Sequence, residues 1–171
     1  MHLGIVSDTH DDLEAVEAAA SFFEREGVDA VVHCGDFVAP FSATPFDAGF
    51  DFYAARGNND GEWSLGPIVE EFGTYLGEAG ALELRGRDLA VYHGTSDVIV
   101  DGLVDAGAYD YVLHGHTHAH GAEERDGTVR VNPGGIPIPV DGADDAFRVA
   151  TIDLSAEPGP GAVEHHELTD Q

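Results

Sequence analysis

Five short clusters of oxygen- and nitrogen-bearing side chains recur along this chain, and each directly follows a hydrophobic run of strand length. Such runs are typical of buried β-strands. Loops that follow parallel strands meet at one edge of an open α/β sheet, where such folds keep their active sites. We therefore expect five segments to converge: Asp8-Thr9-His10, Gly35-Asp36, Gly57-Asn58-Asn59-Asp60, His93-Gly94 and Gly115-His116-Thr117-His118.

The side chains in these clusters match the ligand preferences of divalent metal ions. Two such ions need roughly eight donors from protein and water together. The spacing of two residues within the first and last clusters lets both members of each pair face one side of an extended loop. A thiolate zinc finger is excluded, because Cys34 is the only cysteine. The candidate metal ligands are Asp8, His10, Asp36, Asn58, His93, His116 and His118.

In this order the clusters resemble the signature of the calcineurin-like metallophosphoesterase superfamily. The family pattern is Asp-x-His, Gly-Asp, Gly-Asn-x-Asp/Glu, a later His-Gly and Gly-His-x-His. The resemblance runs from Leu3 to about Gly135 and includes Val131-Asn132-Pro133-Gly134-Gly135, close to the family's Asn-Pro-Gly-Ser. In length the chain is most similar to the small stand-alone phosphodiesterases of bacteria and archaea, the YfcE-like subgroup. Each motif alone is weak evidence, and five in order are strong.

The resemblance implies a dinuclear metal site and its catalytic chemistry. A hydroxide bridging the two ions would attack phosphorus in line, and the metals would neutralise charge on the phosphoryl oxygens. Manganese is the ion we expect to support activity in vitro, with nickel, iron, cobalt and zinc also suited to such ligands. The implied ligands are Asp8, His10, Asp36 and His118 at one metal, and Asp36, Asn58, His93 and His116 at the other, with Asp36 as the bridge and Asp36, Asn58 and His93 as the catalytic group.

The residue after Asn58 departs from a common pattern in the superfamily. Phosphatases and nucleases of the family often carry histidine there, which protonates the leaving alkoxide. This chain has Asn59, and an amide cannot act as a general acid. The small phosphodiesterases also lack that histidine, so the change indicates this subgroup. The neighbouring Asp60 is a candidate to orient Asn58 or a ligand histidine from behind.

Other histidines and the cysteine have plainer interpretations. His114 and His120 are expected to be structural, and His33 is either a buried hydrogen-bonded residue or a support for the metal ligands. The pair His165-His166 is expected to be exposed to solvent. Cys34 is expected to be a small buried residue, and its position beside Asp36 suggests monitoring it for oxidation.

The charge of the chain indicates a protein of high-salt surroundings. It has 33 acidic residues, seven arginines and no lysine, giving a formal charge of -26. Self-repulsion of this size would destabilise a compact chain in ordinary salt, whereas in about 1 M salt the Debye length falls to about 3 Å. The composition therefore resembles that of proteins from extreme halophiles, and an ordinary acidic protein is the alternative.

The same charge constrains the expected partners. A basic surface for nucleic acid is missing, so a small phosphoester is the expected substrate, although molar salt weakens this argument. We expect one domain over residues 1–171, cytoplasmic and not attached to a membrane, because neither a signal peptide nor 18 consecutive apolar residues occur. A homodimer is compatible with the sequence, which does not demand one.

The apolar patterns predict a mixed α/β fold. The family resemblance implies a four-layer αββα sandwich, in which two mixed β-sheets are flanked by helices. Residues 61–80 are ambiguous, and segment 133–139 is either a rigid surface connection or a loop on the substrate side. The last two strands are expected to complete the second sheet. Helices are expected at 11–26, 41–47 and 97–106, and strands at 2–7, 29–34, 50–55, 81–85, 88–93, 109–114, 120–125, 128–132, 147–154 and 162–168.

Three functions remain open at this stage. The first is a metal-dependent phosphodiesterase. The second is a protein-interaction scaffold that keeps the fold without the chemistry, as the retromer subunit of eukaryotes does. The third is a phosphomonoesterase or nuclease of the same superfamily. The seven competent ligand positions favour catalysis, whereas Asn59 removes the obvious general acid.

Overall fold

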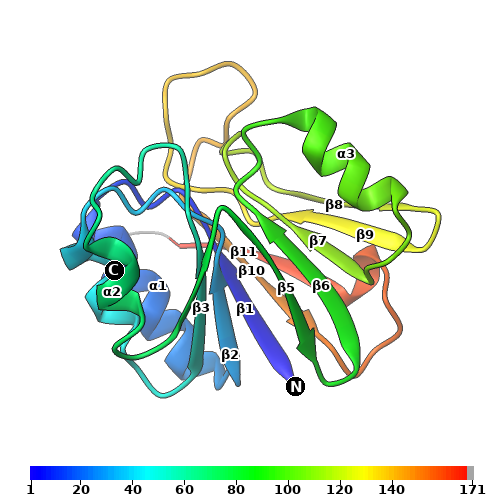
Figure 1. Ribbon diagram of the computed structural model, residues 1–171, viewed down its shortest axis with the longest axis horizontal. Coiled ribbons are helices and arrows are strands. Elements are labelled where there is room, and N and C mark those ends of the chain that lie inside the picture. Colours follow the sequence, from blue (N-terminus) through cyan, green and yellow to red (C-terminus); the bar gives the residue numbers. More distant parts are fainter. Residues whose placement is uncertain (169–171) are drawn as a thin grey trace.

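Two mixed β-sheets pack face to face in the computed structural model, which describes residues 1–168 (Figure 1). The six-stranded sheet has the order β11-β10-β1-β2-β3-β4, and the five-stranded sheet has the order β5-β6-β7-β9-β8. The strands are β1 (His2–Val6), β2 (Ala30–His33), β3 (Asp51–Ala55), β4 (Thr74–Gly77), β5 (Ala79–Leu84), β6 (Arg87–Tyr92), β7 (Tyr111–Leu113), β8 (Gly121–Arg125), β9 (Thr128–Asn132), β10 (Arg148–Asp153) and β11 (Val163–Glu167).

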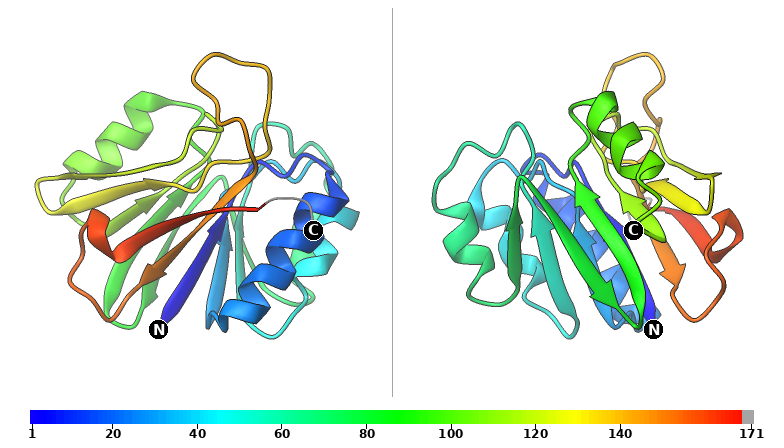
Figure 2. Two further views of the ribbon diagram at one scale, coloured as in Figure 1. Left: turned by 180° about the vertical axis from the view of Figure 1, so that it is seen from behind. Right: turned by 45° about the vertical axis from the view of Figure 1, so that its right-hand side comes forward.

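Helices cover the outer faces of both sheets, which gives the four layers expected from the sequence (Figures 1 and 2). On the first sheet lie α1 (Leu13–Glu26), α2 (Leu65–Val69) and the 3-10 helix η1 (Pro40–Phe46), whereas α3 (Asp97–Asp105) covers the second. A short 3-10 turn, η2 (Pro160–Ala162), precedes β11. No helix within residues 1–168 is long and apolar enough to cross a lipid bilayer.

Helix α1 shows how local sequence positions an element near the site. Its first backbone turn is capped by Asp12, whose side chain accepts a hydrogen bond from the backbone N–H of Ala15 at 3.1 Å. The helix ends at Gly27, which adopts the left-handed conformation. The helix packs closely on β1 at Gly4, where an added Cβ would lie 2.6 Å from the ring of Phe23. Glycine at that position therefore sets the distance between helix and sheet.

The main core lies between the two sheets, where alternate residues of each strand point inward. Leu3 and Ile5 of β1 are fully buried against strands of the second sheet, as are Leu89, Leu113 and Val131 from the other side. Strands β1, β2 and β3 run parallel, and so do β6, β7 and β9. Their carboxyl ends therefore bring the predicted loops to one edge of the sandwich.

The prediction for the last two strands was wrong. Strands β10 and β11 belong to the first sheet, where β10 pairs antiparallel with β1 from His2↔Asp153 to Ile5↔Ala150. In sequence they follow β5 to β9, which all lie in the second sheet. Without β10, the backbone groups along one side of buried β1 would lack partners. The need to pair the backbone groups of β1 therefore decides the position of β10, rather than the proximity of β10 in sequence to the second sheet.

The remaining boundaries lie close to prediction. The helix predicted at 41–47 is the 3-10 helix η1 at Pro40–Phe46, and the helix predicted at 97–106 ends one residue earlier. The ambiguous stretch 61–80 contains α2, β4 and the first residues of β5. Strand β4 extends the parallel part of the first sheet through pairing with β3. The first residue of β4 is exposed and the next three are half-buried, so the strand lacks the alternation of buried and exposed residues that would reveal it.

Candidate metal centre

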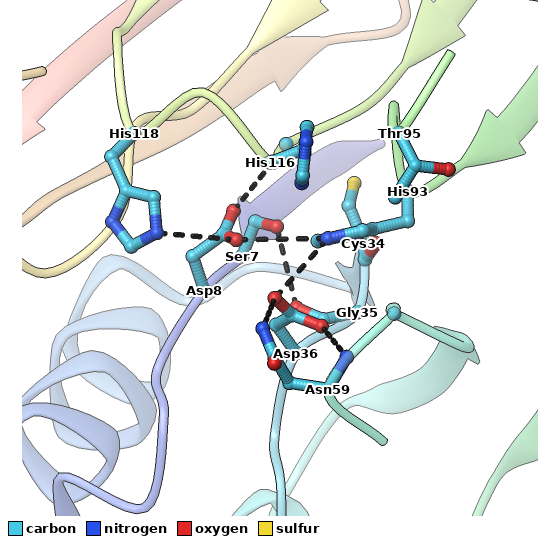
Figure 3. Close-up of polar contacts among 12 residues, drawn as sticks. Ser7, Asp8, Cys34, Gly35, Asp36, Asn59, His93, Thr95, His116 and His118 are labelled. Carbon is cyan, nitrogen blue, oxygen red and sulfur yellow. Dashed lines mark hydrogen bonds and ion pairs between the residues drawn. The ribbon is translucent and has the colours of Figure 1, made fainter. Parts of the chain in front are cut away.

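The predicted ligand loops meet at the carboxyl edge of the strands, and several of their side chains point at one another (Figure 3). Asp8 follows β1, Asp36 follows β2, His93 follows β6 and His118 follows β7. These four side chains are buried. Residues from four separate strands therefore form one compact cluster, as the strand pattern predicted.

One set of potential ligands consists of Asp8, His10 and His118, whose donor atoms lie within 4.8 Å of one another. The Oδ1 atom of Asp8 lies 3.7 Å from Nε2 of His10 and 3.5 Å from Nε2 of His118. The two imidazole Nε2 atoms are 3.2 Å apart. Three donor atoms thus converge on a common point.

A second set consists of Asp8, Asp36 and His93 under the same distance limit. The Nε2 atom of His93 lies 3.3 Å from Oδ2 of Asp36 and 3.8 Å from Oδ1 of Asp8. The Oδ2 atom of Asp36 also lies 3.6 Å from Nε2 of His10. Both carboxylates are therefore close to histidines of both sets. Asp8 is common to the two sets, whereas the family resemblance assigned the bridging position to Asp36.

The structure places the remaining two predicted ligands less centrally. His116 is exposed, and its ring lies edge-on to that of His93 with 5.2 Å between centroids. Its backbone N–H donates to Oδ2 of Asp8 at 2.9 Å. Asn58 is exposed, whereas the next residue contacts the cluster: Asn59 donates to Asp36 from its backbone at 2.8 Å and from its side chain at 2.7 Å. The assignment of Asn58 as a ligand stays a prediction.

Hydrogen bonds to backbone carbonyls orient two of the histidines. The Nδ1 atom of His118 lies 2.7 Å from the carbonyl oxygen of Ile136, and Nδ1 of His93 lies 3.0 Å from that of Cys34. A carbonyl oxygen only accepts, so each Nδ1 carries the proton and each Nε2 is left as a donor atom for a metal. Neither carbonyl partner could be predicted, because a backbone contact leaves no side-chain signature in the sequence.

Asp60 organises two of the loops through their backbones. Its Oδ2 atom accepts from the N–H groups of Asp36 at 2.9 Å and Gly57 at 2.7 Å, and its Oδ1 atom accepts from Val38 at 2.7 Å. The sequence predicted a supporting role for Asp60 toward Asn58 or a histidine. Its observed partners are instead the backbone groups that fix Asp36.

Backbone strain is concentrated in these loops. Positive φ angles occur at five predicted ligands, and residues with a Cβ rarely adopt them. Val38, a β-branched residue beside Asp36, has φ 80. Strain of this kind costs of order 1–3 kcal/mol per residue and persists where surrounding contacts hold it in place. The five ligands are Asp8 (φ 55), His10 (φ 43), Asp36 (φ 64), His116 (φ 71) and His118 (φ 53).

Two glycines permit the close approach of the loops. A Cβ at Gly57 would collide with the carboxylate of Asp36, and a Cβ at Gly115 would collide with the side chains of Ser7 and Asp8. The glycines beside the ligands in the sequence motifs are therefore required by space.

A family model described as the calcineurin-like phosphoesterase superfamily domain matches residues 1–157. The chain belongs to that superfamily. A phosphodiesterase of Methanocaldococcus jannaschii is 36% identical over 141 residues, covering 78% of this chain and 83% of the relative. The solved structure of an archaeal phosphodiesterase aligns with a TM-score of 0.88 and 29% identity, covering 98% of this chain and all of that chain.

Structures of more distant proteins share the superfamily fold. Vps29 of Entamoeba histolytica, a vacuolar protein sorting protein, aligns with a TM-score of 0.68 at 15% identity, covering 97% of each chain. At this identity the likeness concerns the fold alone. The calcineurin-like fold is therefore shared by proteins named as phosphodiesterases and by one named for protein sorting.

The cluster suits the divalent metals of a metallophosphoesterase, because two of its buried atoms have no hydrogen-bond partner among residues 1–168. They are Oδ1 of Asp8 and Nε2 of His93, which face each other across 3.8 Å. An unpaired buried polar atom is costly and calls for an explanation. Both atoms are metal-donor types that point into the cluster, so a bound cation would satisfy them.

The charges in the cluster fit the same conclusion. Burial would raise the pKa of Asp36, but the nearby imidazole of His93, when charged, and hydrogen bonds from Asn59 hold that pKa well below its ordinary value. The pKa of Asp8 is also lowered, because His10 and His93 outweigh the effect of burial. Both carboxylates are therefore ionised at neutral pH, as metal ligands must be.

The other histidines divide into structural roles. His33 is fully buried and hydrogen-bonded to Thr9 and to the backbone of Gly35, and burial lowers its pKa to about 3. His114 is buried and accepts from Nε of Arg130 at 2.8 Å, as expected for a structural residue. His120 is exposed and bonded to Asp144.

Two smaller predictions meet different outcomes. The pair at 165 and 166 is half-buried and hydrogen-bonded to Asn132 and Thr151, so the prediction that it is exposed was wrong. Pairing of β11 with β10 brings these side chains against the sheet.

Cys34 is fully buried, as predicted, and burial raises the pKa of its thiol. Its lack of exposure argues against easy oxidation.

Proposed function

We propose that this chain is a dimetal phosphodiesterase that hydrolyses small phosphodiesters. The observation that carries the proposal is the pair of overlapping Asp and His sets with two unpaired donor atoms at their centre. The 36% identical phosphodiesterase of Methanocaldococcus jannaschii supports the reaction class. When bound, two divalent cations lower the pKa of a water that attacks phosphorus and offset charge on the phosphoryl oxygens.

The chain's own residues hold and orient this centre. Asp8, His10, Asp36 and His118 are proposed at one metal, and Asp36, Asn58, His93 and His116 at the other. The carbonyls behind His93 and His118 accept from each Nδ1 and thereby direct each Nε2 into the centre. The side-chain amide of Asn59 donates to Asp36 and therefore helps to fix that carboxylate. Manganese is our proposed ion for activity in vitro, and the Asp and His ligands also suit nickel, iron, cobalt and zinc.

At position 59 the protein has no acid that could protonate the leaving group. Asn59 cannot donate a proton in the required way, so we propose that substrates with stabilised leaving groups are preferred. The negative charge of -26 further favours a small substrate over nucleic acid, and it favours high salt as the working medium. A homodimer and a cytoplasmic location remain proposals.

The rival function is a scaffold of the same fold. The fold shared with Vps29 keeps this alternative in view, whereas the unpaired donors in the cluster argue for a metal centre. A phosphomonoesterase with the same ligands is the other alternative.

Hydrolysis of bis-p-nitrophenyl phosphate and p-nitrophenyl phosphate tests these functions together. The protein is treated with EDTA and then given manganese in potassium chloride at about 2–4 M, where charge is screened to a few ångströms. We expect metal-restored cleavage of the diester, with slower cleavage of the monoester. Preference for the monoester would indicate a phosphatase. Absence of cleavage of both esters by a folded, metal-loaded protein would favour the scaffold.

A further inference from the structure

The large exposed hydrophobic side chains follow a pattern that the metal centre does not explain. Among residues 1–168 six such side chains are exposed, and Trp63 and Val98 reach 85% and 82%. Single exposed hydrophobic residues are normal on protein surfaces, whereas contiguous exposed apolar patches mark binding sites. The six are Leu13, Phe41, Trp63, Val98, Ile99 and Val140.

All six lie in segments that follow a ligand loop or the segment 131–135. Leu13 opens α1 after the loop of Asp8 and His10, and Phe41 lies in η1 after Asp36. Trp63 follows the asparagine cluster, Val98 and Ile99 begin α3 after His93, and Val140 lies between β9 and β10. The loops that lead into these segments start at the edge of the sandwich where the metal ligands converge (Figures 1 and 2). The exposed apolar side chains therefore belong to segments that border the ligand loops in sequence.

Positive side chains are missing from the same segments. Residues 10–13, 37–46, 57–66, 94–99, 115–120 and 133–147 contain neither lysine nor arginine. The arginines that border them, Arg56 and Arg148, are already in ion pairs with Glu78 and with Asp144, Asp145 and Glu167. Within these segments a substrate with several phosphate groups would find no cationic side chain, and the segments contain acidic residues such as Glu62 and Asp97. Arg130 lines a pocket beside residues 117–120, where its Nε donates to His114.

From this arrangement we infer that the substrate is a phosphodiester with a single negative charge whose organic substituents are apolar or aromatic. The metal centre binds the phosphoryl group. The exposed apolar side chains bind the organic substituents, and Trp63 is the principal aromatic contact. This inference rests on the proposed phosphodiesterase function and narrows its substrate class. Stacking of a ring on an aromatic side chain is typically worth about 5- to 150-fold in binding.

Two esters with the same leaving group isolate this contact. Methyl p-nitrophenyl phosphate and phenyl p-nitrophenyl phosphate both release p-nitrophenolate and differ in the retained substituent. We expect the ratio of kcat/KM for the phenyl ester over the methyl ester to fall by at least about 5-fold in Trp63→Ala. Trp63→Phe is the matched control, since it keeps a ring, and it should retain most of the ratio. An unchanged ratio in Trp63→Ala would overturn the inference while leaving the phosphodiesterase function intact.

Fluorescence provides a readout that does not need turnover, because Trp63 is the only tryptophan of the chain. Phenyl phosphate added to manganese-loaded protein should change the emission of Trp63, whereas inorganic phosphate at equal concentration should change it much less. Equal responses to both ligands would contradict the inference even if neither ester is hydrolysed. The oligomeric state of the wild-type protein and Trp63→Ala is measured in parallel by light scattering. If the wild-type protein is a dimer and Trp63→Ala is not, while the ester ratio is unchanged, the exposed apolar side chains serve self-association. That result would overturn the proposed substrate contact.

Discussion

Asn59 holds both oxygens of Asp36: its backbone N–H donates to Oδ1 at 2.8 Å and its side-chain amide donates to Oδ2 at 2.7 Å. The same Oδ2 lies 3.3 Å from Nε2 of His93. The residue that replaces the usual acid of related phosphatases is therefore a positioning residue for a proposed metal ligand. Its two possible contributions, orientation and the absence of acidity, can be separated by substitution.

Replacing Asn59 with histidine tests the missing acid, and replacing it with alanine is the matched control. Asn59→Ala loses the side-chain bond to Asp36, and loss of such an outer partner typically costs about 10- to 100-fold in activity or metal affinity. Only histidine can donate a proton to the leaving group. Across aryl methyl phosphates with increasing leaving-group pKa, Asn59→His should therefore show a shallower decline in kcat/KM than Asn59→Ala. Parallel declines would reject the acid explanation.

The substitution Asp36→Asn removes a proposed metal ligand at nearly constant volume. We expect activity to fall by more than the 10- to 100-fold that is typical for an outer partner, because an amide is a much weaker ligand than a carboxylate. Circular dichroism should show that the fold is kept. Near-normal turnover with manganese would contradict the assignment of Asp36 to the centre.

Replacing Asp60 with alanine leaves the backbone N–H groups of Asp36, Val38 and Gly57 without their acceptor. Each unpaired buried donor costs about 1–3 kcal/mol when water cannot replace the partner. We expect a lower free energy of unfolding and weaker manganese binding, measured by denaturation with and without the metal. Glu17→Ala on the exposed face of α1 makes the same change in charge and should have little effect. Equal stability of the two variants would contradict the role of Asp60.

Acid should destabilise the metal-free protein in part through His33, whose pKa is lowered by burial to about 3. The unfolded chain takes up this proton near pH 6.5, whereas the folded chain does not until the pH approaches 3. The stability that neutral His33 provides is thus complete above pH 6.5 and is lost as the pH falls, by up to about 1.4 kcal/mol per pH unit. Urea unfolding between pH 7 and 5 should show a smaller decline for His33→Gln than for wild type. Equal declines would mean that His33 does not carry this effect.

Much of the site could be predicted because its side chains follow strands in a fixed order. The convergence of Asp8, Asp36, His93 and His118 follows from parallel strands sharing one edge. The place of β10 beside β1 could not be read from sequence, since it depends on which backbone edge is left unpaired. The carbonyls of Cys34 and Ile136 were also beyond prediction, because a backbone acceptor has no residue type. A supporting role for Asp60 was predicted, but its partners were not, since they are backbone N–H groups.

The most direct test of the dimetal centre is manganese titration of EDTA-treated protein in about 3 M potassium chloride, with bound metal counted per chain by elemental analysis. The account predicts two manganese ions per chain and a rise in melting temperature on loading, because a ligand that binds only the folded state stabilises it. It also predicts fewer than two bound ions in Asp36→Asn. A wild-type protein that binds one manganese or none, without thermal stabilisation, would contradict it.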